Sequence, residues 1–156
     1  MWEKFKKKKE TKPKEEKEYP IVDITLDVFK KAIQDYSRQL PGDIPLSVII
    51  NEDLTIDYQL LAPILKGIPK QTYYMSKETY EIFEENDYQL ALEIDAVQQA
   101  VDKYMRQTDE LPVIQGDPYK KVSFHKLESL NLLQHRPKHH FYITNDEFLI
   151  TYDKPQ

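Results

Sequence analysis

Apolar side chains recur every three or four positions in two long stretches of the sequence, which predicts two amphipathic helices. The first stretch follows Thr25 and Asp27, either of which can cap a helix, and its apolar stripe is Val28, Phe29, Ala32, Ile33, Tyr36 and Leu40. The second runs from Asp95 to Gln107, with the stripe Ala96, Val97, Ala100, Val101 and Tyr104. We expect both stripes to face the core.

Shorter apolar runs between turn residues predict strands. Residues 46–50 and 54–56 adjoin across Asn51-Glu52-Asp53, which predicts a hairpin or two adjoining short strands. Residues 72–75 are strand-like, and residues 141–144 and 148–152 predict a final hairpin across Asn145-Asp146.

Two shorter helices and one ambiguous segment complete the prediction. Asp57 is placed to cap a helix that contains Pro63 and closes at Gly67 in a left-handed conformation. Ser123 is placed to cap another that continues to about Gln134. Residues 77–85 are rich in Lys and Glu, which favours helix over the alternative, a strand. Residues 86–92 are expected to be a linker.

The block 137–150 resembles the block 69–82, which lies 68 positions earlier. At the same offset, five identities recur upstream: Asp27, Ala32, Tyr36, Arg38 and Gln39 match Asp95, Ala100, Tyr104, Arg106 and Gln107. The same offset of 68 positions holds for both groups of matching residues, which favours a tandem duplication of one segment. We therefore predict an α+β fold of two related halves, 20–90 and 91–156, that form one compact unit with helices packed on a small, largely antiparallel sheet.

The composition excludes several classes of protein. A chain of 156 residues with 40% hydrophobic residues is sufficient for one compact domain or for two small domains that share a core. The absence of cysteine excludes disulfides, thiolate metal sites and a cysteine nucleophile. The three glycines, Gly42, Gly67 and Gly116, are too far apart for a phosphate-binding loop or a dinucleotide fingerprint, and no cofactor is expected.

Residues 1–19 differ in composition from the rest of the chain. They contain eight lysines and five glutamates with few apolar residues, which predicts a disordered tail. The first nine residues carry a net charge of +4, whereas residues 20–156 carry −8. Aromatic and basic residues at the start of the tail favour binding to a protein partner or to an anionic membrane surface. These residues are Trp2, Phe5, Lys6, Lys7, Lys8 and Lys9. No apolar run approaches the ~18 residues that a membrane span needs, and no signal peptide is recognised, so we expect a cytoplasmic protein that is peripheral to the membrane if the tail docks there.

Two stretches, PLSVIINEDLTIDY at 45–58 and GIPKQTYYMS at 67–76, resemble a family of small uncharacterised proteins from Gram-positive, Bacillus-type bacteria. The resemblance covers most of residues 20–156. It implies a type of host organism and carries no activity that transfers to these residues.

The four histidines all lie between positions 125 and 140, and neutral imidazoles are good ligands for zinc, nickel or copper. The candidate ligands are His135, His139 and His140. However, Pro137 prevents His135 and His139 from sharing a helical face, and adjacent residues of a strand point to opposite sides. We therefore interpret the cluster as a polar loop that enters a hairpin, and assign no metal.

Carboxylates and aromatic residues are the remaining candidates for chemistry. Paired carboxylates lie in expected turns or at helix ends, as Glu52/Asp53, Glu84/Glu85 and Asp109/Glu110, where we interpret them as solvated charge and assign no catalytic residue. An aromatic set repeats between the halves: Tyr73, Tyr74, Tyr80, Phe141, Tyr142 and Phe148. Alternation along a strand buries half of such rings and leaves the others for a partner. The acidic body makes nucleic acid an unfavourable ligand.

These patterns favour a non-catalytic interaction or adaptor protein, whose basic-aromatic tail docks at the cytoplasmic face of the membrane and whose protein partner is unknown. The alternative is a small enzyme or a ligand-binding domain with a pocket between the two halves. No spacing assigns catalytic residues, so a protein that is not an enzyme is favoured.

Overall fold

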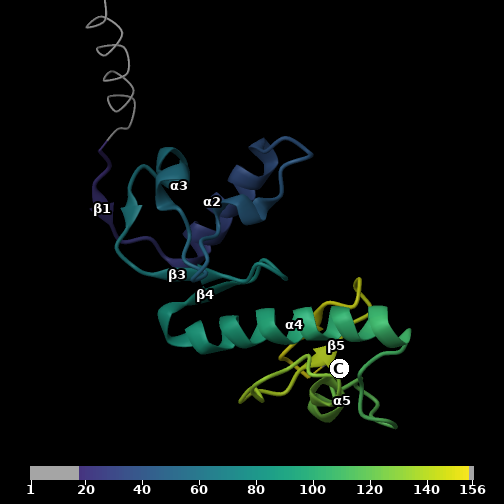
Figure 1. The fold of residues 1–156 in the computed structure, drawn as a ribbon. Coiled ribbons are helices and arrows are strands. Elements are labelled where there is room, and N and C mark those ends of the chain that lie inside the picture. Colours follow the sequence, from purple (N-terminus) through teal and green to yellow (C-terminus); the bar gives the residue numbers. More distant parts are fainter. Residues whose placement is uncertain (1–17, 155–156) are drawn as a thin grey trace, which may run out of the picture. The chain divides into compact units, whose positions relative to one another are not determined.

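The computed structural model describes residues 18–154, and its helices and small sheets confirm the α+β class (Figure 1). Trp2, Phe5 and Lys6 to Lys9 lie outside the described residues. Backbone contacts divide the chain into two compact units. The described part of the first unit is residues 18–38 and 58–70, and the second unit comprises residues 39–57 and 71 onward.

The first unit contains two helices and a two-stranded parallel sheet. Helix α2 (Leu26–Gln39) is capped by Thr25, whose Oγ1 accepts a hydrogen bond from the Val28 amide at 3.3 Å. The predicted stripe of α2 buries Phe29, Ala32 and Ile33. Helix α3 (Tyr58–Leu65) precedes strand β2 (Ile68–Pro69), which pairs in parallel with β1 (Ile21–Val22).

Gly67 closes the chain against β1 rather than ending α3 in a left-handed conformation. The left-handed residue is Lys66, with φ of 58°, so the prediction for Gly67 was wrong. A Cβ atom at Gly67 would lie 2.5 Å from Cγ2 of Val22 and 3.1 Å from the Pro20 carbonyl oxygen. Glycine is therefore required here for close packing of two chain segments.

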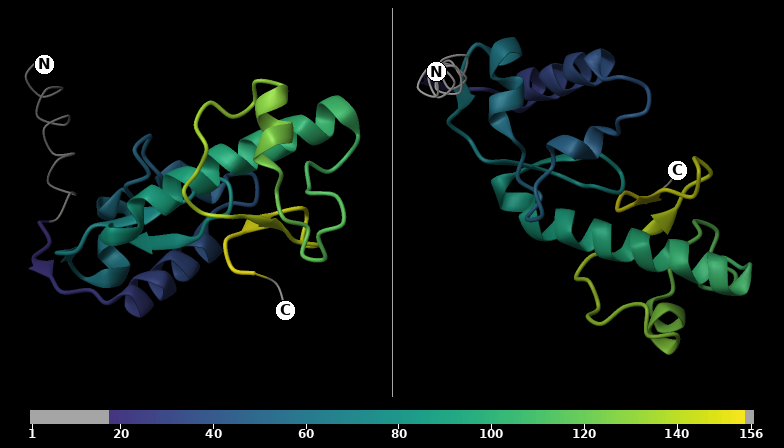
Figure 2. Two further views of the ribbon diagram at one scale, coloured as in Figure 1. Left: turned by 90° about the horizontal axis from the view of Figure 1, so that it is seen from below. Right: turned by 45° about the horizontal axis from the view of Figure 1, so that its top comes forward.

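The second unit is organised around helix α4 (Tyr88–Thr108). Strands β3 (Tyr73–Met75) and β4 (Ile82–Glu84) form one antiparallel hairpin, and β5 (Tyr142–Ile143) and β6 (Ile150–Thr151) form another. Both hairpins contact α4, as does helix α5 (Phe124–Ser129), and these elements lie along α4 in both views of Figure 2. Ten residues of α4 are buried, which makes this helix the core of the unit.

Two segments of the second unit differ from the prediction because backbone context outweighs local propensity. Residues 46–50 were expected to be a strand but form a 3₁₀ helix, η1 (Leu46–Ile49), and only Ile50 pairs with Ile56. The preceding Pro45 carbonyl accepts from the Val48 amide at 3.2 Å, which starts the 3₁₀ turn. Residues 77–85, expected to be helical, instead form a turn, strand β4 and the start of a second 3₁₀ helix, η2 (Glu85–Asp87).

Helix boundaries in the second unit also differ from the prediction. Residues 86–92 are not a linker, because α4 begins at Tyr88, about two turns before Asp95. Ser123 caps α5 as predicted, with its Oγ accepting from the Lys126 amide at 3.2 Å. However, α5 ends at Ser129 rather than near Gln134, and Asn131 takes a left-handed φ of 59° just beyond it.

The two hairpins have the same register at an offset of 68 positions. The pairs Tyr74↔Phe83 and Met75↔Ile82 of the first correspond to Tyr142↔Thr151 and Ile143↔Ile150 of the second. At the same offset, Tyr80 and Phe148 both take left-handed conformations, with φ of 62° and 61°. Bulky side chains rarely adopt this conformation, so its recurrence is an unusual shared feature. Within residues 18–154, no helix is long and apolar enough to cross a bilayer.

Candidate functional site

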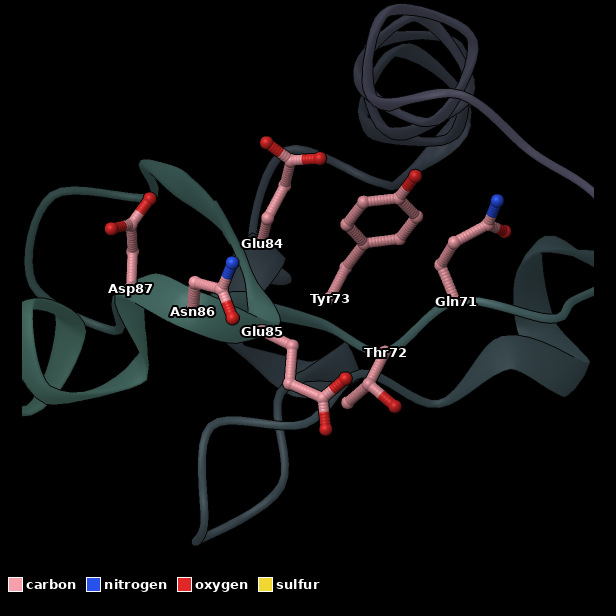
Figure 3. Close-up of a pocket in the computed structure, with 7 residues that line it drawn as sticks. All are labelled: Gln71, Thr72, Tyr73, Glu84, Glu85, Asn86 and Asp87. Atoms are coloured by element: carbon pink, nitrogen blue, oxygen red, sulfur yellow. The ribbon is translucent and has the colours of Figure 1, made fainter.

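A hollow of about 430 Å³ surrounds the open end of the β3–β4 hairpin, where the chain enters β3 and leaves β4 (Figure 3). Its lining combines three carboxylates with polar side chains and one phenol: Gln71, Thr72, Tyr73, Glu84, Glu85, Asn86 and Asp87. We call this site the acidic hollow. Its lining contains no lysine or arginine.

The hairpin register determines which side chains share a side of the acidic hollow. Tyr73 pairs with Glu84, and both side chains extend to the same side in Figure 3. Thr72 and Glu85 extend to the opposite side, as alternation along a strand requires. The carboxylates are therefore distributed over both sides of the hairpin end.

The phenols of this region respond to the neighbouring negative charge. Burial raises the pKa of Tyr73, and the charge of Glu84 raises that pKa further. Burial also raises the pKa of Tyr74, with additional contributions led by Glu85. Since a negative charge destabilises a phenolate, these shifts indicate that each phenol lies in the field of a carboxylate.

Tyr74 and Tyr88 form an aromatic surface beside Glu85. Their ring centroids lie 4.2 Å apart with the planes tilted by 35°, and both side chains are half-buried. A cationic side chain is attracted electrostatically to the face of a tyrosine ring and to a carboxylate. This end of the hairpin thus offers both groups that recognise lysine and arginine.

A buried carboxylate of α4 positions the other end of this hairpin. Asp95 accepts hydrogen bonds from Ser76 Oγ at 2.5 Å, from the Lys77 amide at 3.0 Å and from the Glu78 amide at 3.3 Å. Ser76 Oγ in turn accepts from the Thr79 amide at 2.9 Å. Asp95 is 9% exposed and Ser76 is fully buried, so this network is a structural clamp and not an open catalytic pair.

The predicted histidine candidates are exposed, and among the contacts of the described residues only His139 of the three pairs with a carboxylate. Its Nδ1 lies 2.9 Å from Oε1 of Glu93, a buried carboxylate, and its backbone amide donates to the same oxygen at 3.2 Å. Burial raises the pKa of Glu93, but hydrogen bonds from the His139 ring, from the amides of residues 138 and 139 and from Gln89 outweigh burial and lower it. His135 lines a different hollow beside α4.

Within residues 18–154, no group of three or more histidine, aspartate or glutamate side chains is arranged to hold a metal ion. The pairing of Glu93 with His139 was not predicted, because 46 positions separate the two residues. The acidic hollow was also missed, since Glu84/Glu85 were interpreted as solvated charge. The repeated aromatic set, which includes Tyr73 and Tyr74, was the one signal in the sequence that pointed to this region.

A family model described as a protein of unknown function (DUF3939) matches residues 19–152. Comparisons with curated proteins and with solved structures give no match. The match covers both compact units and includes all residues of the acidic hollow.

Proposed function

The chain belongs to the DUF3939 family, and from its own geometry we propose that it is a non-catalytic interaction protein that docks a basic segment of a protein partner on the acidic hollow. The observation that carries the proposal is the gathering of Glu84, Glu85 and Asp87 around one hollow whose lining contains no lysine or arginine. A lysine or arginine of the partner would pair with these carboxylates.

The tyrosines supply the second part of the proposed recognition. A guanidinium that stacks on the Tyr74 and Tyr88 rings has the Glu85 carboxylate beside it. Arginine is better suited than lysine to this arrangement, because its planar group combines stacking with paired hydrogen bonds to a carboxylate. The proposed partner segment is therefore rich in arginine and lysine.

The internal use of the buried polar groups supports binding over catalysis. Asp95 and Glu93, the buried carboxylates of α4, both accept backbone amide hydrogen bonds that organise neighbouring segments. General acid–base catalysis requires a carboxyl group that can exchange its proton with a substrate. These two carboxylates are committed to the fold instead.

Neutralising the acidic hollow should weaken the binding of arginine-rich peptides by about tenfold, because three exposed charge pairs contribute ~1.5 kcal/mol together. The test variant is Glu84→Gln/Glu85→Gln/Asp87→Asn, measured by fluorescence anisotropy at low salt with labelled arginine-rich and lysine-rich peptides. Asp87 is the N-cap of α4 but makes no side-chain capping bond, so its substitution removes no such bond.

The control variant Glu110→Gln/Asp146→Asn/Glu147→Gln changes the net charge equally, from −5 to −2, at exposed positions away from the acidic hollow. We expect it to change the dissociation constant less than about twofold. Equal weakening of peptide binding by both variants would show attraction to the overall negative charge and would refute a specific site.

Tyr74→Leu should weaken the binding of arginine-rich peptides more than the binding of lysine-rich peptides.

A second proposal concerns the basic-aromatic tip, for which the observation is the sequence Trp2 to Lys9 with its net charge of +4 in the first nine residues. We propose that it docks on anionic membrane, since lysines near such a surface contribute ~1 kcal/mol each. Sedimentation with anionic vesicles at low and physiological salt should show salt-sensitive binding that is lost when residues 2–9 are removed. Equal sedimentation of both proteins at both salt concentrations would rule this docking out.

A further inference from the structure

A second hollow region, distinct from the acidic hollow, lies between α4 and the segment 132–137. Two neighbouring hollows of about 180 and 300 Å³ share Ala96, Leu133 and His135 in their lining, so they form one continuous groove. We call it the α4 groove. It is lined on one side by Leu92, Ala96, Gln99 and Lys103, which lie on one side of α4 at helical spacing.

Specific contacts hold the segment 132–137 as the opposite wall. Leu133 is 7% exposed, and the Leu132 amide donates to the Leu127 carbonyl at 2.9 Å. Arg136 forms a two-bond ion pair with Glu128 of α5, with both distances 2.9 Å. The pairing of Glu93 with His139 fixes the chain just after this wall to α4. The groove is thus bounded by anchored elements on both sides.

The lining of the α4 groove combines apolar side chains with two cationic residues, one in each hollow. Leu92 is 38% exposed, and Ala96 lies one turn further along α4 with its side chain also exposed. Lys103 lies in the lining of one hollow and Arg136 in that of the other. The bonds to Glu128 use Nε and Nη2 of Arg136, so Nη1 takes no part in that ion pair. Glu93, the carboxylate in this lining, is buried and engaged by His139 and Gln89.

We propose that the α4 groove docks a partner segment in which an apolar side chain is flanked by acidic residues. The apolar side chain would cover Leu92, Ala96 and Leu133, and the flanking carboxylates would meet Lys103 and Arg136. Charge complementarity selects this occupant, because Lys103 and Arg136 in the lining attract carboxylates, in contrast to the acidic hollow, which attracts cations. Together with the proposed function, on which this step rests, the protein then has one docking surface for basic segments and one for acidic segments. Two such surfaces would allow it to join two different partners, as an adaptor does.

The experiment selects phage-displayed random peptides on the full-length protein, with counter-selection against the variant Ala96→Glu. Peptides that depend on the α4 groove should carry leucine, isoleucine, methionine or phenylalanine close to aspartate or glutamate. Fluorescence anisotropy should show that Lys103→Glu weakens the binding of these peptides by about tenfold. The matched control Arg106→Glu makes the same charge change at an exposed position of the same helix, outside the groove lining, and should change the affinity less than about twofold.

The proposal is overturned if no peptide distinguishes the native protein from Ala96→Glu while both proteins have the same melting temperature. It is also overturned if the selected peptides are basic, or if Arg106→Glu weakens them as much as Lys103→Glu. A dimer in sedimentation velocity that Lys103→Glu disrupts would make a second copy the occupant and would likewise overturn it. Since Lys103 is exposed, its substitution keeps the test valid even if Ala96→Glu lowers the stability of the protein. Acidic-hollow variants should bind these peptides normally, which separates this proposal from the previous one.

Discussion

Asp95→Ala should lower the stability of the protein by ~3 kcal/mol, the larger of the two effects we expect from substitutions in α4. The substitution removes a carboxylate that accepts three hydrogen bonds, from Ser76 Oγ and from the amides of Lys77 and Glu78. Hydrogen bonds to a charged group contribute ~1.5–3 kcal/mol each, but the amides are only partly buried and regain water as partners. The melting temperature should therefore fall by ~6–12 °C for a chain of this size.

Amide hydrogen exchange provides a local test of the same clamp. The amides of Lys77, Glu78 and Thr79 should lose protection in Asp95→Ala, since Ser76 Oγ, which accepts from Thr79, also loses its anchor. The control Glu110→Ala removes an exposed carboxylate after α4 and should leave both protection and melting temperature unchanged. Unaltered exchange in Asp95→Ala would show that the loop is held by other contacts.

The helices that follow a strict apolar period were predictable from the sequence. Most residues of the predicted stripes of α2 and α4 are at least partly buried, including Phe29 and Val97. Val28 and Ala96 were also expected to face the core, but both are exposed, because each lies at the edge of its stripe. The α+β class and the final hairpin followed from the same kind of pattern. Such patterns can be read from the sequence because the residues that share one helix face or one strand face are close together along the chain.

Segments whose conformation depends on distant residues were not predictable. Residues 77–85 have good helix formers, but Asp95 binds the amides at the start of this segment, and Tyr80 adopts φ of 62°, which interrupts a helix. The strand that follows pairs with β3 in the register that recurs in the second hairpin. The tandem duplication remains a prediction, and the shared register and the shared left-handed aromatic position are the observations that support it.

The candidate sites depended even more on tertiary structure. Strand register brings together the residues of the acidic hollow that face each other across the hairpin, such as Tyr73 and Glu84. The α4 groove joins side chains of residues 89–103 with those of residues 132–137, two segments that no sequence periodicity connects. The paired glutamates and the clustered histidines therefore gave no indication of which side chains share a surface.

Gln98→Leu should destabilise the second hairpin by ~2 kcal/mol, because a buried amide would be replaced by an apolar group of similar size. Gln98 is 2% exposed, and its Oε1 accepts from the Ile150 amide at 2.8 Å. Its Nε2 donates to the Phe148 carbonyl at 3.2 Å and to Asp102 Oδ1 at 3.1 Å. The substitution leaves the Ile150 amide buried without an acceptor, so that amide should exchange faster while the amides of β3 and β4 remain protected.

Gln98→Glu separates the roles of the acceptor and the donor in this clamp. The introduced carboxylate can still accept from the Ile150 amide, but it offers no proton to the Phe148 carbonyl and lies beside Asp102. Burial and the charge of Asp102 should raise the pKa of the introduced carboxyl group above that of an exposed glutamate. Its neutral form, favoured as the pH falls through that raised pKa, again donates a hydrogen bond, so the stability difference from the native protein should shrink toward acid. Denaturant unfolding of both proteins across this pH range measures that difference, and a gap that stays constant or widens toward acid would contradict a clamp that requires a donor at this position.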